Sequence, residues 1–499
     1  MAEHLIPIEE ARENLLACAA FLAEDIKSSD GHAEAMKTIV PYYLAKSDVD
    51  LAAEFADTVD DPFVRDKLLT LVAEKCAATG DDEYAFQLVE AIEDTSSQRT
   101  ARERIALQKS TRGEFEKALE IAQTLDHADD AFADIAAHQV ASGDEASALQ
   151  TIEKIDFPNA KVNALLAIAS LNLQKGETQK AFEFLEKAFD AANEIEFNEE
   201  KIRAFLDIAR MFAQAKRNDK TIETLDKARA SAETIEGIHR DSFFTEIALE
   251  FLRAGTIDLA DRTLDLVADK TQIASCLTGF SQQFFVKGER EEALETLEEA
   301  YAILKSQRDA ETRDSRARFS LFSTIAVQFA NFEKAERAIE IAQNINNENE
   351  QTSALAQIAQ VCTLQGKDEF ARQAVQAIED DAQKMFALIA VSDAKNRAGK
   401  REEALDILRE AAALAETVPQ LASRSLAFND LAKRFREYNE TEKAREILYE
   451  NLETIAQIRD ESSRAVTLAQ LAEIYDQANF ALTDSEKQTL LTMIRRAEW

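Results

Sequence analysis

Residues 143–148 read Gly-Asp-Glu-Ala-Ser-Ala, and residues 176–181, 33 positions later, read Gly-Glu-Thr-Gln-Lys-Ala. A glycine followed five residues later by an alanine accounts for eight of the 11 glycines: Gly80/Ala85, Gly113/Ala118, Gly143/Ala148, Gly176/Ala181, Gly255/Ala260, Gly288/Ala293, Gly366/Ala371 and Gly399/Ala404. Most successive glycines lie 30 or 33 residues apart, and each of the two wider gaps holds one degenerate copy. A period of this length predicts a stacked-repeat protein in which each unit is one supersecondary element.

The composition predicts an almost wholly helical, soluble chain. Hydrophobic residues make up 46% of the 499 residues, and only 5 are proline. The formal net charge is -36, from 58 basic and 94 acidic residues, which excludes nucleic acid and anionic lipid as expected partners. The acidic surface would suit a basic partner, and it would equally serve solubility alone. The four cysteines are scattered without metal-ligand spacing, so we expect a cytoplasmic protein and no membrane span.

Each period reads as two helices, here called helix A and helix B, joined by a tight turn. Helix A is expected over about residues 162–174, and Gly176 suits a left-handed residue at its end. Helix B then starts near Ala181. A small residue stands twelve before each such alanine, which indicates a close crossing of the two helices: Ala73, Ala106, Ala136, Ala169, Ala209, Ala248, Ser281, Ala359, Ser392 and Ala432.

The copies differ in length and in their turns. Short units have about 33 residues and long units about 40, and the extra two helical turns are expected to lengthen helix B. The turn is predicted to survive without glycine at Ser47, Lys216 and Asn439. At Ala335 the crossing residue Ala326 is only nine positions away, so a shortened, distorted turn is expected there.

Long polar or basic side chains recur at the start of helix A, eight residues before its small residue (nine for Gln272): Arg65, Gln98, Lys161, Lys201, Arg240, Gln272, Arg318, Gln351, Lys384, Arg424 and Arg464. Cations there oppose the helix dipole. We expect them to pair with acids, for example Lys201 with Glu199 or Glu200, and Arg464 with Glu461. The alternative is a functional basic rail along one edge.

The pattern resembles the tetratricopeptide repeat (TPR), in which small residues lie where two antiparallel helices cross. The matching residues include Ile168-Ala169 with Ala181, Leu185 and Ala188. The resemblance implies an all-α, right-handed α-solenoid of about 12–13 antiparallel helix pairs. We expect an amphipathic entry helix over residues 1–30, the solenoid over 31–480 and a capping helix over 481–499. Thr483-Asp-Ser-Glu486 reads as a capping box, and Leu490, Leu491 and Ile494 are expected to cover the end of the stack.

The resemblance also implies a non-catalytic scaffold that binds a protein or peptide partner along the helix A face. Sequence offsets from the small residue of helix A place candidate binding residues on that face, with Arg253 just beyond it: Leu166, Ser170, Leu173, Arg203, Arg210, Lys433 and Arg436. Small neighbours such as Ser323 and Ser353 belong to the same face. The arginines and lysine could clamp a carboxylate or could form salt bridges with surrounding acids.

No catalytic motif, metal-ligand set or cofactor-binding loop is present in the sequence, so neither catalysis nor a cofactor is expected. Two other functions stay open, a self-assembling structural subunit and a regulatory module that binds a small ligand. A monomer is favoured. The partner's identity does not follow from the sequence.

Overall fold

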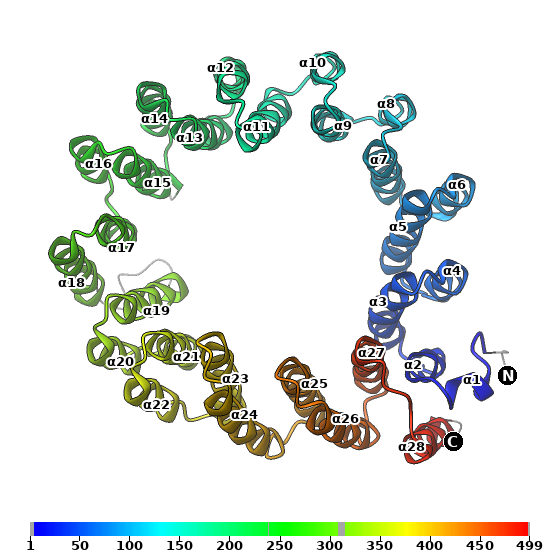
Figure 1. Ribbon diagram of the computed structural model, residues 1–499. Helices are drawn as coiled ribbons and strands as arrows, with labels where there is room; N and C mark the ends of the chain where they lie inside the picture. The colour runs from blue at the N-terminus through cyan, green and yellow to red at the C-terminus, as the bar shows by residue number, and fades with distance from the viewer. Residues whose placement is uncertain (1–3, 238, 308–314, 498–499) are drawn as a thin grey trace. The chain divides into compact units, whose positions relative to one another are not determined.

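The computed structural model describes residues 4–237, 239–307 and 315–497, so residues 1–3 and 498–499 of the two expected end segments lie outside it. The described residues form 28 helices and no strand, as the composition predicts (Figure 1). They divide into two compact units. Unit 1 comprises Met1–Gln108 and Ala359–Trp499, and unit 2 comprises Lys109–Ile358.

The helix A elements are the odd-numbered helices from α3 to α27. Their bounds are α3 (Ser29–Ala45), α5 (Pro62–Thr79), α7 (Thr95–Thr111), α9 (Asp129–Ser142), α11 (Pro158–Gln174), α13 (Asn198–Gln214), α15 (His239–Arg253), α17 (Lys270–Lys287), α19 (Ser315–Asn331), α21 (Glu348–Leu364), α23 (Asp381–Arg397), α25 (Leu421–Glu437) and α27 (Glu461–Ala478). Within unit 2, successive helix A elements from α9 to α19 contact one another in a row.

The helix B elements fall into two length classes, as the spacing of the repeats predicts. The short ones have 8 to 10 residues: α4 (Val49–Asp57), α6 (Asp82–Ala91), α8 (Phe115–Ala122), α10 (Glu145–Ile152), α16 (Ile257–Leu264), α20 (Ala335–Gln343) and α22 (Asp368–Gln376). The long ones have 15 or 17: α12 (Thr178–Glu194), α14 (Asn218–Ala232), α18 (Arg290–Ser306), α24 (Arg401–Ala415) and α26 (Thr441–Ile455). The added two turns keep the apolar face in register.

The turn between helix A and helix B contains one residue in the left-handed region. Gly176 has φ 78° there, and Ser47, Lys216 and Asn439 adopt the same conformation without glycine, as predicted. The shortened turn expected before Ala335 is wrong. Glu333 is the left-handed residue (φ 65°), and the alanine five positions later is Ala338, so the turn has its normal length.

The crossing of the two helices explains why serine can replace alanine in helix A. Ala293 and Ala404 of helix B are fully buried. The hydroxyl of Ser281 donates to the Ala293 carbonyl at 2.6 Å, and that of Ser392 donates to the Ala404 carbonyl at 2.7 Å. The two helices are therefore close enough for a direct hydrogen bond at the position where other repeats carry two small residues.

The recurring basic and amide side chains at the start of helix A mostly bind backbone carbonyls, not acids. The expected pairing with a carboxylate holds for Arg65, which contacts Glu93 at 2.8 Å. Arg240 also contacts an acid, Asp241, at 3.6 Å. In six other repeats the acceptor is a carbonyl at the end of the preceding helix B or in its linker: Ile92 for Gln98, Asn193 for Lys201, Gln307 for Arg318, Gln343 for Gln351, Val418 for Arg424 and Ile458 for Arg464. These donors satisfy the unpaired carbonyls that end a helix. Glutamine is as suitable as arginine, because the position requires an N–H donor.

The first helices of the chain pack against the last ones within unit 1. Helix α1 (Ile8–Ala11) precedes α2 (Leu15–Glu24), which packs on α27 about as extensively as α5 packs on α6. Helix α3 also packs on α27, as consecutive helix A elements do elsewhere. Helix α2 therefore takes the place of helix B beside α27. We call this pair, formed from the two ends of the chain, the junction repeat.

Helix α2 is not the amphipathic helix that the sequence predicted. Every residue from Leu15 to Ala23 is buried, because α2 contacts α1, α3, α27 and the last helix, α28 (Asp484–Ala497). Polar contacts flank the junction. The Tyr42 hydroxyl donates to Glu473 at 3.1 Å, and Lys46 contacts Asp476 at 2.6 Å.

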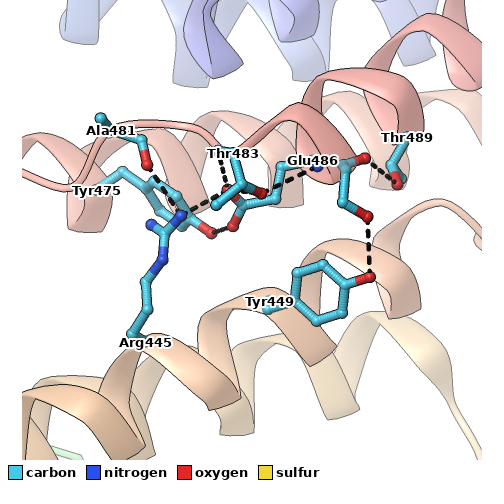
Figure 2. A network of polar contacts seen from close by, with 8 residues as sticks. Arg445, Tyr449, Tyr475, Ala481, Thr483, Glu486 and Thr489 are labelled. Atoms are coloured by element: carbon cyan, nitrogen blue, oxygen red, sulfur yellow. Dashed lines mark hydrogen bonds and ion pairs between the residues drawn. The ribbon is translucent and has the colours of Figure 1, made fainter.

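The predicted capping box at the start of α28 is present (Figure 2). The Thr483 backbone N–H donates to Glu486 at 2.6 Å, and the Glu486 N–H donates to the Thr483 hydroxyl at 3.3 Å. Glu486 is fully buried, and its carboxylate also accepts from Arg445 at 2.5 Å and from the Tyr475 hydroxyl at 2.6 Å. This network fixes α28 to α26 and α27.

Candidate functional site

The candidate binding surface is the row of helix A elements in unit 2. The row consists of α9, α11, α13, α15, α17 and α19, which follow one another. Each of them packs against its own helix B, which lies on the side away from this surface (Figure 1). The three candidates on α11 lie on this row. Leu166, Ser170 and Leu173 are half-buried, and both leucines pack against the core of unit 2. They therefore offer a surface of small and apolar groups.

Two of the three candidate arginines in unit 2 share one acid. Arg210 on α13 and Arg253 on α15 both donate to Oε1 of Glu250, at 2.7 and 2.6 Å. The Glu250 side chain is only 8% exposed, so this acceptor is held inside the surface. Arg210 also contacts Asp207 at 2.9 Å. The structure thus brings these residues together in a salt-bridge network with acids of the chain itself, which is the second of the two roles considered for them in the sequence.

The charge of Arg210 is secured by this network. Burial works against the charged form, but the hydrogen bond that Arg210 donates to Glu250 and the nearby Asp207 outweigh it and raise the Arg210 pKa. Arg203 differs, because it is exposed and makes no ion pair within the described residues. Its guanidinium lies 5.9 Å from the centre of the Phe243 ring. Of the three, Arg203 is the one best placed to meet a ligand carboxylate.

The remaining two candidates lie on α25 in unit 1. Lys433 and Arg436 are one helical turn apart and half-buried. Neither makes an ion pair in the part of the chain that the structure describes, and the Nη1 atom of Arg436 is buried without a hydrogen-bond partner. The role of these residues in binding stays a prediction.

Sequence offsets alone missed about half of the lining of a polar cavity of about 280 Å³ on the helix A row. Its lining comes from α17, α19 and α21: Gln282, Ser320, Ser323, Thr324, Val327, Gln328, Asn331, Glu350, Ser353 and Gln357. Ser323 and Ser353 were expected on this face, and Gln282 stands one residue after Ser281, an offset that also faces it. The signal that could have found the cavity is the run of amide and hydroxyl side chains over three consecutive repeats.

Hydrogen bonds order the wall of this polar cavity. Gln328 is 7% exposed and donates to the Thr278 carbonyl at 3.0 Å, which ties α19 to α17. Gln357 donates to the Ser353 hydroxyl at 3.1 Å within α21. Glu350 is the one carboxylate among the ten lining residues. The cavity is therefore nearly uncharged in a chain whose net charge is -36.

The described residues give no support to metal or thiol chemistry. They contain no group of three or more His, Cys, Asp or Glu side chains placed to hold a metal ion. All four cysteines are buried, and burial raises the pKa of the Cys18 and Cys276 thiols to about 12. Both thiols are therefore protonated and poorly nucleophilic at neutral pH. No described helix combines the length and the apolar character that crossing a membrane requires.

Helix pairs, left-handed turns and small crossing residues together show that the chain is a TPR-like helical repeat array. No protein-family model matches the sequence, and no curated protein matches it either.

Several solved structures match parts of this chain, with little shared sequence and low TM-scores. They include Ton1535 from Thermococcus onnurineus NA1, 19% identical over 72% of this chain and 98% of that one, with a TM-score of 0.25. The TPR-like repeats of a putative kinesin light chain from Podosopora anserina are 17% identical over 45% of this chain and 100% of that one (TM-score 0.25). The apo form of the quorum sensor NprR from B. thuringiensis is 14% identical over 72% and 100% (TM-score 0.26). These similarities add no functional assignment.

Proposed function

We propose that the chain is a protein-interaction scaffold whose helix A surface binds an extended segment of a partner protein. The observation that carries the proposal is the polar cavity over α17, α19 and α21. Its amide and hydroxyl side chains can both donate and accept hydrogen bonds, which is what the N–H and C=O groups of a peptide backbone require. Because the cavity holds a single carboxylate, binding there would depend on hydrogen bonds and shape more than on charge.

The proposal extends to the neighbouring part of the row. The half-buried Leu166 and Leu173 would receive apolar side chains of the segment, and Arg203 would meet a carboxylate. Arg210 and Arg253 would shape the surface from within their network with Glu250. In this scheme the scaffold is non-catalytic, and it acts by holding a partner in a defined position.

The test begins with selection of binding peptides from a random displayed library on the full chain. The affinity of a selected peptide is then compared between Ser353→Arg, which fills the cavity with a long charged side chain, and Gln150→Arg, which adds the same charge to an exposed site on α10. We expect Ser353→Arg to weaken binding at least about tenfold and Gln150→Arg to leave it unchanged. Affinity should hold between about 0.1 M and about 1 M salt. Equal effects of the two variants, or failure to enrich any peptide, would count against the proposal.

We also propose that the chain is a monomer. Helix α27 would be the exposed end of the array, but α2 and α3 cover it within unit 1. End-to-end stacking of solenoids needs such a free end. The mass in solution, measured by light scattering over a hundredfold range of concentration, should stay that of one chain. A mass that rises with concentration would favour the self-assembling alternative.

A further inference from the structure

A second cavity, of about 670 Å³, lies in unit 2 where α9, α11 and α13 begin. It is lined by linker residues, by the first two turns of these helices and by the end of α12, and it shares no lining residue with the polar cavity. Two large aromatic side chains that line this cavity are exposed to solvent. Phe157 is 61% exposed and Phe197 is 70% exposed. We call this region the aromatic edge.

The two phenylalanines occupy a position that other repeats use for helix capping. Each stands twelve residues before the small residue of its helix A and is the N-cap of α11 or α13, without a side-chain capping bond. At the same position Asp61, Asp269, Asp380 and Asp460 accept backbone N–H bonds. Aspartate at an N-cap stabilises a helix, and phenylalanine does not. Helix stability therefore gives no reason for an exposed phenylalanine in two consecutive repeats.

The cavity between the phenylalanines is strongly acidic. Its lining includes five carboxylates (Asp129, Asp130, Glu194, Glu196 and Glu200), and among the described lining residues His127 is the one basic side chain, with no lysine or arginine. Two of these carboxylates already have hydrogen-bond donors within the chain. Asp129 accepts from the Phe157 backbone N–H at 2.7 Å, and Glu200 accepts from the Asn159 side chain.

The other three carboxylates are available to a partner. Asp130, Glu194 and Glu196 are exposed and make no hydrogen bond or ion pair within the described residues. The positive ends of the helices that begin here offset part of this charge. Five carboxylates without a counter-cation still leave the site negative.

We propose that the aromatic edge binds a basic segment of a partner protein, in which lysine or arginine alternates with apolar residues. The cation would lie over a phenylalanine ring and donate to the available carboxylates, and the apolar residues would fill the space between the rings. Charge complementarity selects this occupant, because an acidic or neutral peptide would leave the carboxylates uncompensated. This surface is distinct from the helix A surface, so the two can be tested separately.

The first test measures the binding of a fluorescent twelve-residue peptide of alternating lysine and leucine to the full chain by anisotropy. The double variant Phe157→Ser/Phe197→Ser removes both rings and supplies a hydroxyl that can cap each helix. We expect it to lower affinity at least about tenfold while the melting temperature stays equal or rises. Wild-type affinity in this variant would overturn the proposal, and so would a fall in affinity accompanied by loss of folding.

A matched charge control separates the site from the general acidity of the chain. Glu194→Gln/Glu196→Gln removes two charges at the aromatic edge, and Glu291→Gln/Glu292→Gln removes two from the exposed face of α18. We expect the first pair to weaken binding about tenfold and the second less than about twofold, at about 0.1 M salt. Equal effects would mean non-specific attraction to an acidic protein. Ser353→Arg should leave this peptide's affinity unchanged, so failure of the scaffold proposal and failure of this one can be told apart.

Discussion

The junction repeat and an ordinary repeat such as α17/α18 reach the same packing by different routes. In α17/α18 a single left-handed residue, Gly288, reverses the chain, and helix B follows at once. In the junction repeat no turn joins the two helices, and Tyr42 and Glu473, which meet beside it, are 431 residues apart in the sequence. The comparison teaches that the helix B position is defined by the apolar surface of helix A and not by chain connection.

The difference has an energetic consequence. A helix held by a short turn remains close to its partner even when contacts weaken, whereas α2 depends on its contacts alone. Two features hold this end of the chain in place. Helix α2 is completely buried from Leu15 to Ala23, and the network around Glu486 fixes α28, which packs on α2. The ion pairs that flank the junction, such as Lys46–Asp476, are solvent-exposed and contribute little.

The largest effect is expected from a charge placed inside α2. Ala19 is fully buried, and Ala19→Asp would bury an unpaired carboxylate, which destabilises by roughly 4 kcal/mol or more. Urea unfolding should show a lower midpoint, and limited proteolysis should cut first near α2. The control Lys27→Asp introduces an aspartate at an exposed position just after α2. If the two variants unfolded alike, α2 would not be packed as described.

Glu486→Gln tests the anchor of α28. The variant leaves the partly buried Arg445 guanidinium without its counter-charge, and the single amide oxygen can accept either from Tyr475 or from Thr483 and Arg445, but not from all three. We expect a loss of about 2–4 kcal/mol in the free energy of unfolding. The exposed pair Arg337–Glu298 offers a matched control, and Glu298→Gln should cost less than about 1 kcal/mol. Similar losses from both would contradict a special role for the buried network.

The turns offer a smaller contrast between the two kinds of repeat. Gly288 has φ 87° with open space around it, so Gly288→Ala should cost about 1–2 kcal/mol through backbone strain alone. Asn479, after α27, has φ 51° but leads to α28 and not to a helix B. Asn479→Gly should be neutral or slightly stabilising. Thermal melts of the two variants give the comparison, and a neutral Gly288→Ala would show that the turn is not held in the left-handed region.

The smallest effect is a pH dependence of opposite sign in two parts of unit 1. Burial raises the pKa of Glu24 in α2, so the folded state holds this proton more tightly and stability rises as the pH falls through that pKa. The hydrogen bond from Lys395 lowers the pKa of Asp368, so its contribution is present above the unfolded pKa and is lost as the pH falls further.

Both pH effects should be roughly 1 kcal/mol or less after solvent screening. The test is to measure the urea midpoint between pH 7 and 3. In Glu24→Gln the increase in stability that Glu24 contributes at falling pH should disappear. In Asp368→Asn the decrease that Asp368 contributes should disappear. If a variant kept the pH profile of the wild type, the substituted group would not contribute to the pH dependence of stability.

Much of the local structure could be predicted from the sequence. The turns, the crossing residues and the two lengths of helix B follow from patterns within about 40 residues, because each rests on local backbone conformation or on neighbouring helices. The misplaced register at Ala335 was avoidable from the sequence, since Ala335 and Ala338 both look like anchors but only Ala338 stands twelve residues after Ala326, and the left-handed Glu333 agrees with that choice.

The candidate binding surface was less accessible to sequence reasoning. The offsets placed Arg210 on the face and Arg253 just beyond it, but whether the two are available depends on Glu250, which is buried between them. The polar cavity likewise requires three helices to lie side by side. Side chains on separate repeats share a site only once the helices are packed, and no pattern within one repeat contains that information.

The sequence by itself determined the repeat, because helix periodicity and turn chemistry are short-range properties of the chain. Tertiary structure alone decided the partner of α27. The apolar residues of α2 are compatible with any buried position, and nothing in their order points to a helix more than 400 residues away. The packed structure selects it because α27 would otherwise expose the apolar face that helices such as α17, α23 and α25 bury against their own helix B.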